Sequence, residues 1–164
     1  MSEKLLHTIP PVYDSNSHVL ILGSFPSVKS REAQFFYGHR QNRFWRVLTD
    51  VLGWKHIPET VEEKKRLLLE SNIALWDVIG SCEIVGSSDA SIREVVPNDI
   101  SVILQSADIE KIYCNGGKAF ELYNKYILPV IGREAAKLPS TSPANAAKNL
   151  DALIAEWRVI NVNE

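Results

Sequence analysis

Short apolar runs that alternate with helical patterns constrain this chain more than any other feature of its 164 residues. Four apolar runs are predicted to be strands, at residues 18–22, 72–79, 109–114 and 136–138. Five segments are predicted to be helices, at residues 43–52, 59–70, 99–106, 118–130 and 143–156. Strands that alternate with helices favour a mostly parallel sheet with helices on both faces. We therefore expect an α/β fold of three αβα layers around a central, mostly parallel sheet of four to five strands.

Three stretches do not fit this alternation. Residues 23–42 are predicted to form a long loop, and residues 82–99, rich in glycine and serine, to be irregular. The tail at residues 158–162 is expected either to form an edge strand or to fray. A loop as long as the first is usually functional or disordered, and the aromatic residues at 35–37 argue against disorder.

The loops that follow the predicted strands hold the most distinctive residues of the chain. In a parallel sheet the ligands bind at the carboxyl ends of the strands. The loops after Leu22, Ile79, Cys114 and Leu138 should all open on that edge. The predicted layout and the unusual residues therefore point to the same side of the molecule.

The composition predicts a single cytoplasmic domain spanning residues 1–164, with 45% apolar residues. No apolar run approaches the ~20 residues that cross a bilayer, and residues 1–10 lack the pattern of a signal peptide. The two cysteines, Cys82 and Cys114, cannot supply a four-thiolate cluster and are expected to be buried thiols. We therefore expect a monomer with no metal, no cofactor and no membrane contact.

Charge is distributed unevenly along the chain. The formal net charge is −2, which argues against a surface that holds nucleic acid indiscriminately. Between residues 29 and 46, however, five basic residues stand against one acidic residue, Glu32. The basic residues are Lys29, Arg31, Arg40, Arg43 and Arg46. This stretch could form a local footprint for a polyanion.

The first candidate motif, GSFPS at residues 23–27, leaves the first predicted strand. Gly23 permits a tight turn, and Pro26 fixes the backbone direction. Such a loop can aim backbone groups at a base or a water, which makes Ser24 and Phe25 candidate base-binding residues. Taken alone this signal is weak, and an ordinary turn at a strand end is the favoured interpretation.

The segment GHRQNRFW at residues 38–45 is more specific. Its two large aromatic residues are expected in the core. Asn42 either caps the helix that follows or presents a carboxamide oxygen that orients a water. Arg40 and Arg43 either contact phosphates or are simply solvated.

The segment STSPAN at residues 140–145 is predicted to begin the last helix, with Ser142 as the N-cap and Pro143 in the first helical position. The unpaired N–H groups and the positive dipole end of a helix suit a phosphate. This makes Ser140, Ser142 and Asn145 candidate phosphate-binding residues. An ordinary capped helix start is the alternative.

Taken in order, GSFPS, YGHRQNRFW and STSPANA resemble the motifs of the uracil-DNA glycosylase superfamily. The resemblance is closest to the hypoxanthine-DNA glycosylases, also described as DNA-deoxyinosine glycosylases. It extends to WDVIGSCEIVGSSDASI and IYCNGGKAF, and it covers about residues 18–157. The resemblance implies a glycosylase fold, an aromatic residue at Tyr37 that stacks on the flipped base, and a catalytic asparagine at Asn42.

The sequence departs from the wider superfamily at two positions. Phe25 stands where many members have an Asp or Asn that activates water, and Ser140 stands where many have a His or Asn. Ser140 can donate one hydrogen bond and carries no charge. These changes favour hypoxanthine over uracil, and the cysteine count excludes the iron–sulfur members.

The resemblance therefore implies excision of a deaminated base, most simply hypoxanthine, from double-stranded DNA. Asp77 or Asn115, at strand ends, could read the base edge, although capping or ion pairing would also explain Asp77. Asn42 would orient a water, and no lysine is placed as a nucleophile, so the enzyme should be monofunctional.

Three alternatives remain at this stage. A uracil or mismatch-specific glycosylase of the same fold would act on G·U pairs rather than on inosine. A catalytically inactive DNA-binding module would bind lesions without releasing a base. A generic nucleotide-binding domain is less well supported, because the chain has neither G-x-G-x-x-G nor a Walker loop.

Overall fold

A computed structural model describes residues 3–85 and 88–161 of the chain. The strands are β1 (Glu3–Leu6), β2 (Val19–Gly23), β3 (Ile73–Asp77), β4 (Ile79–Ile84), β5 (Arg93–Pro97), β6 (Lys111–Asn115) and β7 (Ala136–Leu138). The α-helices are α1 (Val28–Ala33), α2 (Phe44–Val51), α3 (Val61–Glu70), α4 (Ser101–Ser106), α5 (Gly117–Leu122), α6 (Leu128–Ile131) and α7 (Leu150–Trp157). Three further helical turns are η1 (Asp89–Ser91), η2 (Tyr123–Ile127) and η3 (Arg158–Ile160).

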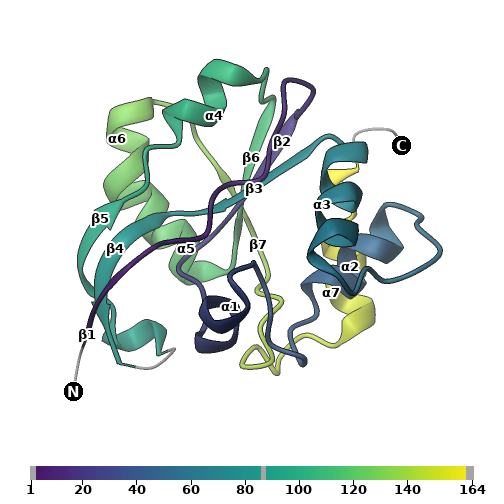
Figure 1. The fold of residues 1–164 in the computed structure, drawn as a ribbon, viewed down its shortest axis with the longest axis horizontal. Coiled ribbons are helices and arrows are strands. Elements are labelled where there is room, and N and C mark those ends of the chain that lie inside the picture. The colour runs from purple at the N-terminus through teal and green to yellow at the C-terminus, as the bar shows by residue number, and fades with distance from the viewer. Residues whose placement is uncertain (1–2, 86–87, 162–164) are drawn as a thin grey trace.

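The central sheet has four parallel strands in the order β3-β2-β6-β7. Figure 1 shows α2, α3 and α7 on one side of this sheet and α4, α5 and α6 on the other. The three-layer α/β fold is therefore confirmed. A second, antiparallel sheet has the order β1-β4-β5.

Alternating side chains of the central strands fill two separate cores. Val19 and Ile21 point into the core under α2, α3 and α7, whereas Leu20 and Leu22 point into the core under α4 and α5. Successive residues of a strand face opposite sides, so a parallel strand covered on both faces must be apolar throughout. This is why residues 18–22 form an unbroken apolar run.

The parallel register places several motif residues at one edge of the sheet. Gly23 at the end of β2 is paired with Asp77 at the end of β3. Asn115 at the end of β6 is paired with Leu138 at the end of β7. The carboxyl ends of all four strands therefore lie along one edge of the sheet, as expected. The expected loop after Ile79 is wrong, because Ile79 belongs to β4 of the other sheet.

The second sheet was missed in the sequence. Residues 82–99, predicted to be irregular, include the end of β4 and all of β5, which pair in an antiparallel hairpin with irregular register. The predicted strand at 72–79 is two strands, because the chain passes from β3 in one sheet to β4 in the other at Val78. β1 lies outside every predicted element and pairs with β4.

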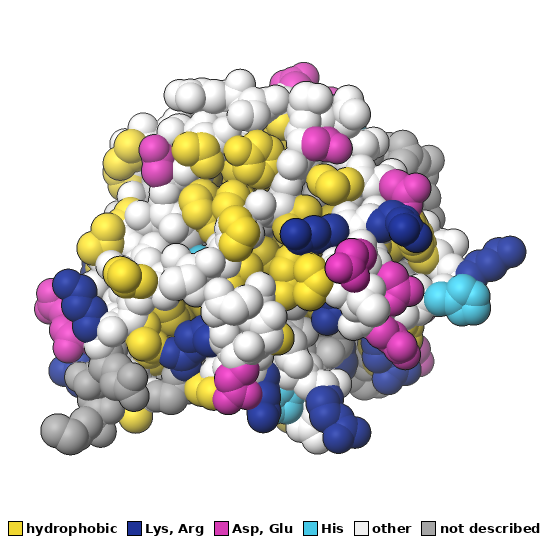
Figure 2. Space-filling model, viewed as in Figure 1, with side chains coloured by type: hydrophobic (Ala, Val, Ile, Leu, Met, Phe, Trp, Pro, Cys, Tyr) yellow, Lys and Arg dark blue, Asp and Glu magenta, His cyan; other side chains and the backbone are white. Residues whose placement is uncertain are grey.

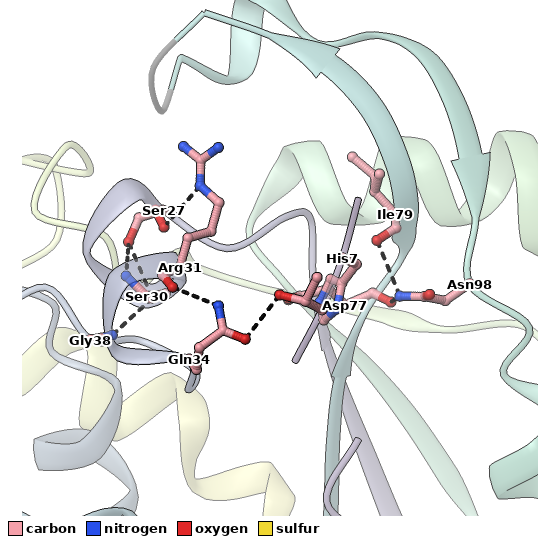
Figure 3. Close-up of polar contacts among 10 residues, drawn as sticks. His7, Ser27, Ser30, Arg31, Gln34, Gly38, Asp77, Ile79 and Asn98 are labelled. Atoms are coloured by element: carbon pink, nitrogen blue, oxygen red, sulfur yellow. Dashed lines mark hydrogen bonds and ion pairs between the residues drawn. The ribbon is translucent and has the colours of Figure 1, made fainter. Parts of the chain in front are cut away.

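The long loop at 23–42 contains the short helix α1. The Ser27 side chain accepts a hydrogen bond from the Ser30 backbone N–H and so caps this helix. The Ser30 hydroxyl in turn accepts from the Gly38 N–H across 2.9 Å. These contacts, drawn in Figure 3, fix the segment that carries Tyr37.

The predicted helix at 118–130 is confirmed as the consecutive helical segments α5, η2 and α6, which span residues 117–131. The prediction for the last helix was wrong in its start. The last helix begins at Leu150 rather than at Pro143, and its N-cap is Asn149 rather than Ser142. The tail forms the helical turn η3 instead of an edge strand, and Val162 lies outside the described residues.

Arg43 explains why the helix does not start at Pro143. Its guanidinium donates to the backbone carbonyls of Ser142, Asn145 and Lys148, at 2.9, 3.1 and 2.5 Å. Carbonyls aimed at one side chain do not point along a common helix axis. Residues 142–148 therefore form a series of turns around the guanidinium.

Within the described residues, no helix combines the length and the apolar character that a bilayer span requires.

Candidate active site

A cavity of about 500 Å³ opens at the carboxyl edge of the central sheet. This volume falls within the ~300–1,000 Å³ typical of sites for small molecules. Its lining comes from the turn at 23–27, Phe36, Tyr37, His39, Asn42, Asp77, residues 115–118 and residues 140–144. All three motifs therefore meet in one cavity, together with the ends of β3 and β6.

The Asn42 side chain is fixed by two hydrogen bonds to the same oxygen. Its Oδ1 accepts from the Phe44 N–H at 2.9 Å and from the Thr141 hydroxyl at 2.8 Å. Because a carboxamide oxygen has two lone pairs, both are engaged. The oxygen expected to orient a water is thus already occupied, and Nδ2 is the polar group left to face the cavity.

Thr141 connects Asn42 to Asn115. The Asn115 Nδ2 donates to the Thr141 hydroxyl at 3.0 Å, and the Thr141 N–H donates to the Asn115 Oδ1 at 3.1 Å. Thr141 is fully buried. Thr141 was not among the predicted site residues, although it lies inside the STSPAN motif.

Tyr37 lies with its ring stacked on Phe44, with 4.0 Å between ring centroids and 21° between ring planes. Its backbone has a φ of 53°, in the left-handed region. Tyr37 also lines the cavity. This geometry suits a base that stacks on an aromatic ring.

The Tyr37 hydroxyl is buried and has no hydrogen-bond partner among the described residues. Burial, with a further contribution from the charge of Asp77, raises the pKa of Tyr37 far above its ordinary value. The nearby Asn115 side chain opposes this rise. The phenol therefore stays neutral, and Tyr37 cannot supply a phenolate to the site.

Asp77 reaches the cavity from the end of β3, and its Oδ2 lies 2.8 Å from Nε2 of His7. The two side chains are only 5% and 1% exposed. Asn98 donates to the backbone carbonyls of Asp77 and Ile79 and so fixes the corner between β3 and β4 (Figure 3). His7 carries no motif and was missed, because only the tertiary structure brings β1 to this place.

Gly23 is required by the close approach of these groups. A Cβ built on Gly23 would lie 2.4 Å from Asp77 Oδ1 and 2.9 Å from the Tyr37 hydroxyl. Any larger residue would displace both side chains. Ser24 and Phe25, the candidate base-binding residues of the same turn, both line the cavity.

The candidate DNA-binding residues divide into two groups. Arg40 is exposed, as a phosphate contact would require, and it follows His39, which lines the cavity. Arg43 is not available in this way, because its Nε and both Nη atoms donate to carbonyls of the 141–148 segment. We therefore assign Arg43 a positioning role in place of the expected phosphate contact.

The remaining candidates shape the same segment. The Ser140 hydroxyl accepts from the Ser142 N–H, and the Ser142 hydroxyl accepts from the Ala144 N–H, both at 3.1 Å. The Asn145 amide donates to the Ser140 carbonyl at 3.0 Å. Ser140 and Ser142 line the cavity, but they do so from turns and not from the expected helix start.

Lys118 also lines the cavity and was not anticipated. Its ammonium lies 3.3 Å from the Glu121 carboxylate. Figure 2 shows further Lys and Arg side chains along the lower edge of the molecule, where Figure 1 places α1 and the loops of the carboxyl edge. In residues 3–85 and 88–161, no three His, Cys, Asp or Glu side chains are grouped so that they could hold a metal ion.

The fold and this cavity define an α/β domain that can enclose one flat, polar ring beside a basic edge. The family described as the uracil DNA glycosylase superfamily matches residues 10–161. The chain therefore belongs to the uracil DNA glycosylase superfamily, and it is a DNA glycosylase of that superfamily.

Individual relatives agree with this membership. A hypoxanthine DNA glycosylase of Methanosarcina acetivorans is 35% identical over 154 residues, which cover 92% of this chain and 94% of the relative. One of Methanosarcina barkeri is 34% identical over 136 residues, covering 83% and 85%. A solution NMR structure from M. acetivorans, described as a candidate uracil DNA glycosylase, has a TM-score of 0.77 at 35% identity, covering 93% of this chain and 96% of its own.

Proposed function

We propose that the protein hydrolyses the N-glycosidic bond of a deaminated base, hypoxanthine, that has been flipped out of double-stranded DNA. The observation that carries this proposal is the convergence of Tyr37, Asn42, Asp77 and Asn115 on one cavity. The names of the two Methanosarcina relatives support hypoxanthine as the base.

The cavity floor fits the edge of hypoxanthine. The base carries a donor at N1–H, and an ionised Asp77 presents only acceptors. Adenine carries a lone pair at N1 and would be repelled by the same carboxylate. The flipped base would stack on the Tyr37 ring, which would offset part of the few kcal/mol that flipping costs.

Asn42 is the catalytic residue in this proposal. Bond cleavage gives the sugar oxocarbenium character and places negative charge on the departing purine. Because Asn42 Oδ1 accepts two hydrogen bonds already, the side chain acts through Nδ2. A fixed N–H donor can hold the attacking water in place or support the charge on the purine.

The experiment compares duplexes that carry inosine, uracil or xanthine at one position. We expect base release from inosine and an abasic strand that breaks only after alkali. Borohydride should trap no covalent complex, because the proposed mechanism uses a water and no lysine as the nucleophile. If inosine strands stay intact while G·U pairs are cut, the enzyme is a uracil or mismatch-specific glycosylase instead.

Asn42→Ala tests the assignment of the catalytic residue. It should abolish turnover while the affinity for inosine duplexes changes little. Asn124→Ala, at an exposed position of η2, is the matched control and should be fully active. Equal turnover in both variants would remove Asn42 from the mechanism, and tight binding without any base release by the wild type would identify an inactive binding module.

A further inference from the structure

We propose that His7 is a positioning residue that sets base selection by fixing the Asp77 carboxylate. The inference rests on the proposed function and deepens it. His7 Nε2 lies 2.8 Å from Asp77 Oδ2, and both side chains are almost fully buried. The class of substrate that this pair selects is a base with a ring N–H on the edge that enters the cavity.

The two oxygens of Asp77 have different surroundings. Oδ2 is engaged by His7, whereas Oδ1 lies against Gly23 and makes no hydrogen bond within the described residues. A buried carboxylate is costly unless it is hydrogen-bonded. If the His7–Asp77 pair were purely structural, we would expect both oxygens of Asp77 to be hydrogen-bonded. Oδ2 is bonded and Oδ1 is not, and Asp77 lines the cavity. This arrangement indicates that Oδ1 accepts a hydrogen bond from a ligand.

The imidazole ring of His7 is held on several sides. Phe25 and Trp76 meet it edge-on, with ring centroids 6.0 and 6.3 Å away. Phe25 itself lines the cavity, so His7 lies between the first motif and Asp77. The ring therefore cannot turn without disturbing the cavity wall.

The backbone of β1 is fixed equally well. The His7 N–H donates to the Gly80 carbonyl at 2.8 Å, and Leu6 pairs with Ser81 in the antiparallel sheet. The next residue, Thr8, donates from its hydroxyl to the Gln34 side chain at the end of α1 at 2.9 Å. An edge strand near the start of the chain thus delivers one rigid side chain to the site.

The chemical consequence follows from the direction of the hydrogen bond. An Nε2–H that donates to Oδ2 keeps Asp77 an acceptor and keeps Oδ1 aimed at the cavity. Oδ1 then accepts from the N1–H of hypoxanthine. Without that donor the carboxyl group can rotate, and Oδ1 is no longer held where it distinguishes a ring N–H from a ring lone pair.

The test compares His7→Leu, which removes the donor, with His7→Gln, whose amide retains one. The measured quantities are the single-turnover rate of base excision and the enzyme concentration that gives half of the maximal rate. Both are determined on inosine duplexes and on duplexes with unsubstituted purine, which has no ring N–H. We expect His7→Leu to lower inosine excision by about tenfold or more, with a smaller change on purine. His7→Gln should recover most of the inosine activity, and both variants should bind DNA as the wild type does.

Two results would overturn the role of His7. One is an equal loss on inosine and purine, and the other is a folded His7→Gln variant as slow as His7→Leu. If the wild type cuts uracil or xanthine but not inosine, the proposed function fails, and the same comparison on that base still decides the role of His7. A wild type that releases no base overturns both proposals.

Discussion

The hydroxyl of Thr141 donates to Oδ1 of Asn42 across 2.8 Å and joins two loops that are 99 residues apart in the chain. The same hydroxyl accepts from the Asn115 amide. One buried side chain thus orients two of the residues that the site depends on.

Thr141→Val should therefore slow base excision with little change in DNA affinity. The change keeps the shape of the side chain but leaves the Asn115 amide and the Asn42 oxygen each short of a partner, which costs about 1–3 kcal/mol per group. A small displacement of a catalytic group can reduce the rate by about a hundredfold. Single-turnover rates at saturating enzyme measure the effect.

Thr141→Ser is the matched control, because it keeps the hydroxyl and loses only a methyl group. Its rate should remain within about threefold of the wild type. A serine variant as slow as the valine variant would show that the methyl packing, and not the hydrogen bonds, maintains the site.

Arg43 should contribute more to the stability of the protein than to DNA affinity. Its guanidinium donates to four backbone carbonyls of the 141–148 segment. Hydrogen bonds to a charged group contribute about 1.5–3 kcal/mol each, so we expect Arg43→Gln to lower the free energy of unfolding by about 3 kcal/mol or more. Urea denaturation measures this, and an unchanged midpoint would contradict it.

Arg40, unlike Arg43, should contribute to DNA affinity and not to the stability of the protein. Its side chain is exposed, so Arg40→Gln should leave the unfolding midpoint unchanged. If Arg40 contacts a phosphate, the variant should bind all duplexes more weakly and reduce the slope of log affinity against log salt by about one. An unchanged salt slope would show that Arg40 is merely solvated.

The fold could be predicted where the decisive interactions are local. The strand β2 is a continuous apolar run, and α2 shows helical spacing, so both were recognised from the sequence. The strands β1 and β5 were not, because they are short and partly charged, and their pairing with β4 depends on segments distant in the chain. The start of α7 was misplaced because Ser142 and Pro143 resemble a helix start, while Arg43 binds the carbonyls that a helix would use.

The residues of the candidate site likewise differ in how far the sequence predicts them. Tyr37, Asn42 and Asn115 belong to motifs, and the structure brings them into one cavity. His7 has no local signal, since its place beside Asp77 follows from the pairing of β1 with β4. Sequence patterns identify residues that carry a motif, but not partners supplied by another sheet.

Cys114 should be chemically inert although it lies in the strand that ends at the cavity. Burial raises the pKa of its thiol to about 12, and burial also raises the pKa of Cys82. The thiolate is the reactive form, so at neutral pH almost none is present. Iodoacetamide should label neither cysteine in the native protein at pH 8, as measured by mass spectrometry, and should not reduce activity. Labelling after denaturation is the control.

Tyr37→Phe should stabilise the protein and preserve its activity. The hydroxyl is buried without a partner in the described structure, and such a group costs about 1–3 kcal/mol. Its removal should raise the free energy of unfolding by about 1 kcal/mol, while the ring still stacks on Phe44. Tyr37→Ala should lose most of the excision rate, because no ring remains beneath the base. A phenylalanine variant with the activity of the alanine variant would show that the hydroxyl itself contacts the base.

The stabilities of the wild type and of the Tyr37→Phe variant should also diverge at high pH. In the unfolded chain a tyrosine ionises near its ordinary pKa of 10.0, whereas burial raises the pKa of Tyr37 in the folded state. Above pH 10 the unfolded state therefore binds fewer protons than the folded state, and the free energy of unfolding falls as the pH rises. Tyr37→Phe removes this contribution, so its stability advantage should grow between pH 10 and pH 11. Urea midpoints at these two pH values test the prediction, and a constant difference would mean that the Tyr37 hydroxyl ionises as readily in the folded protein as in the unfolded chain.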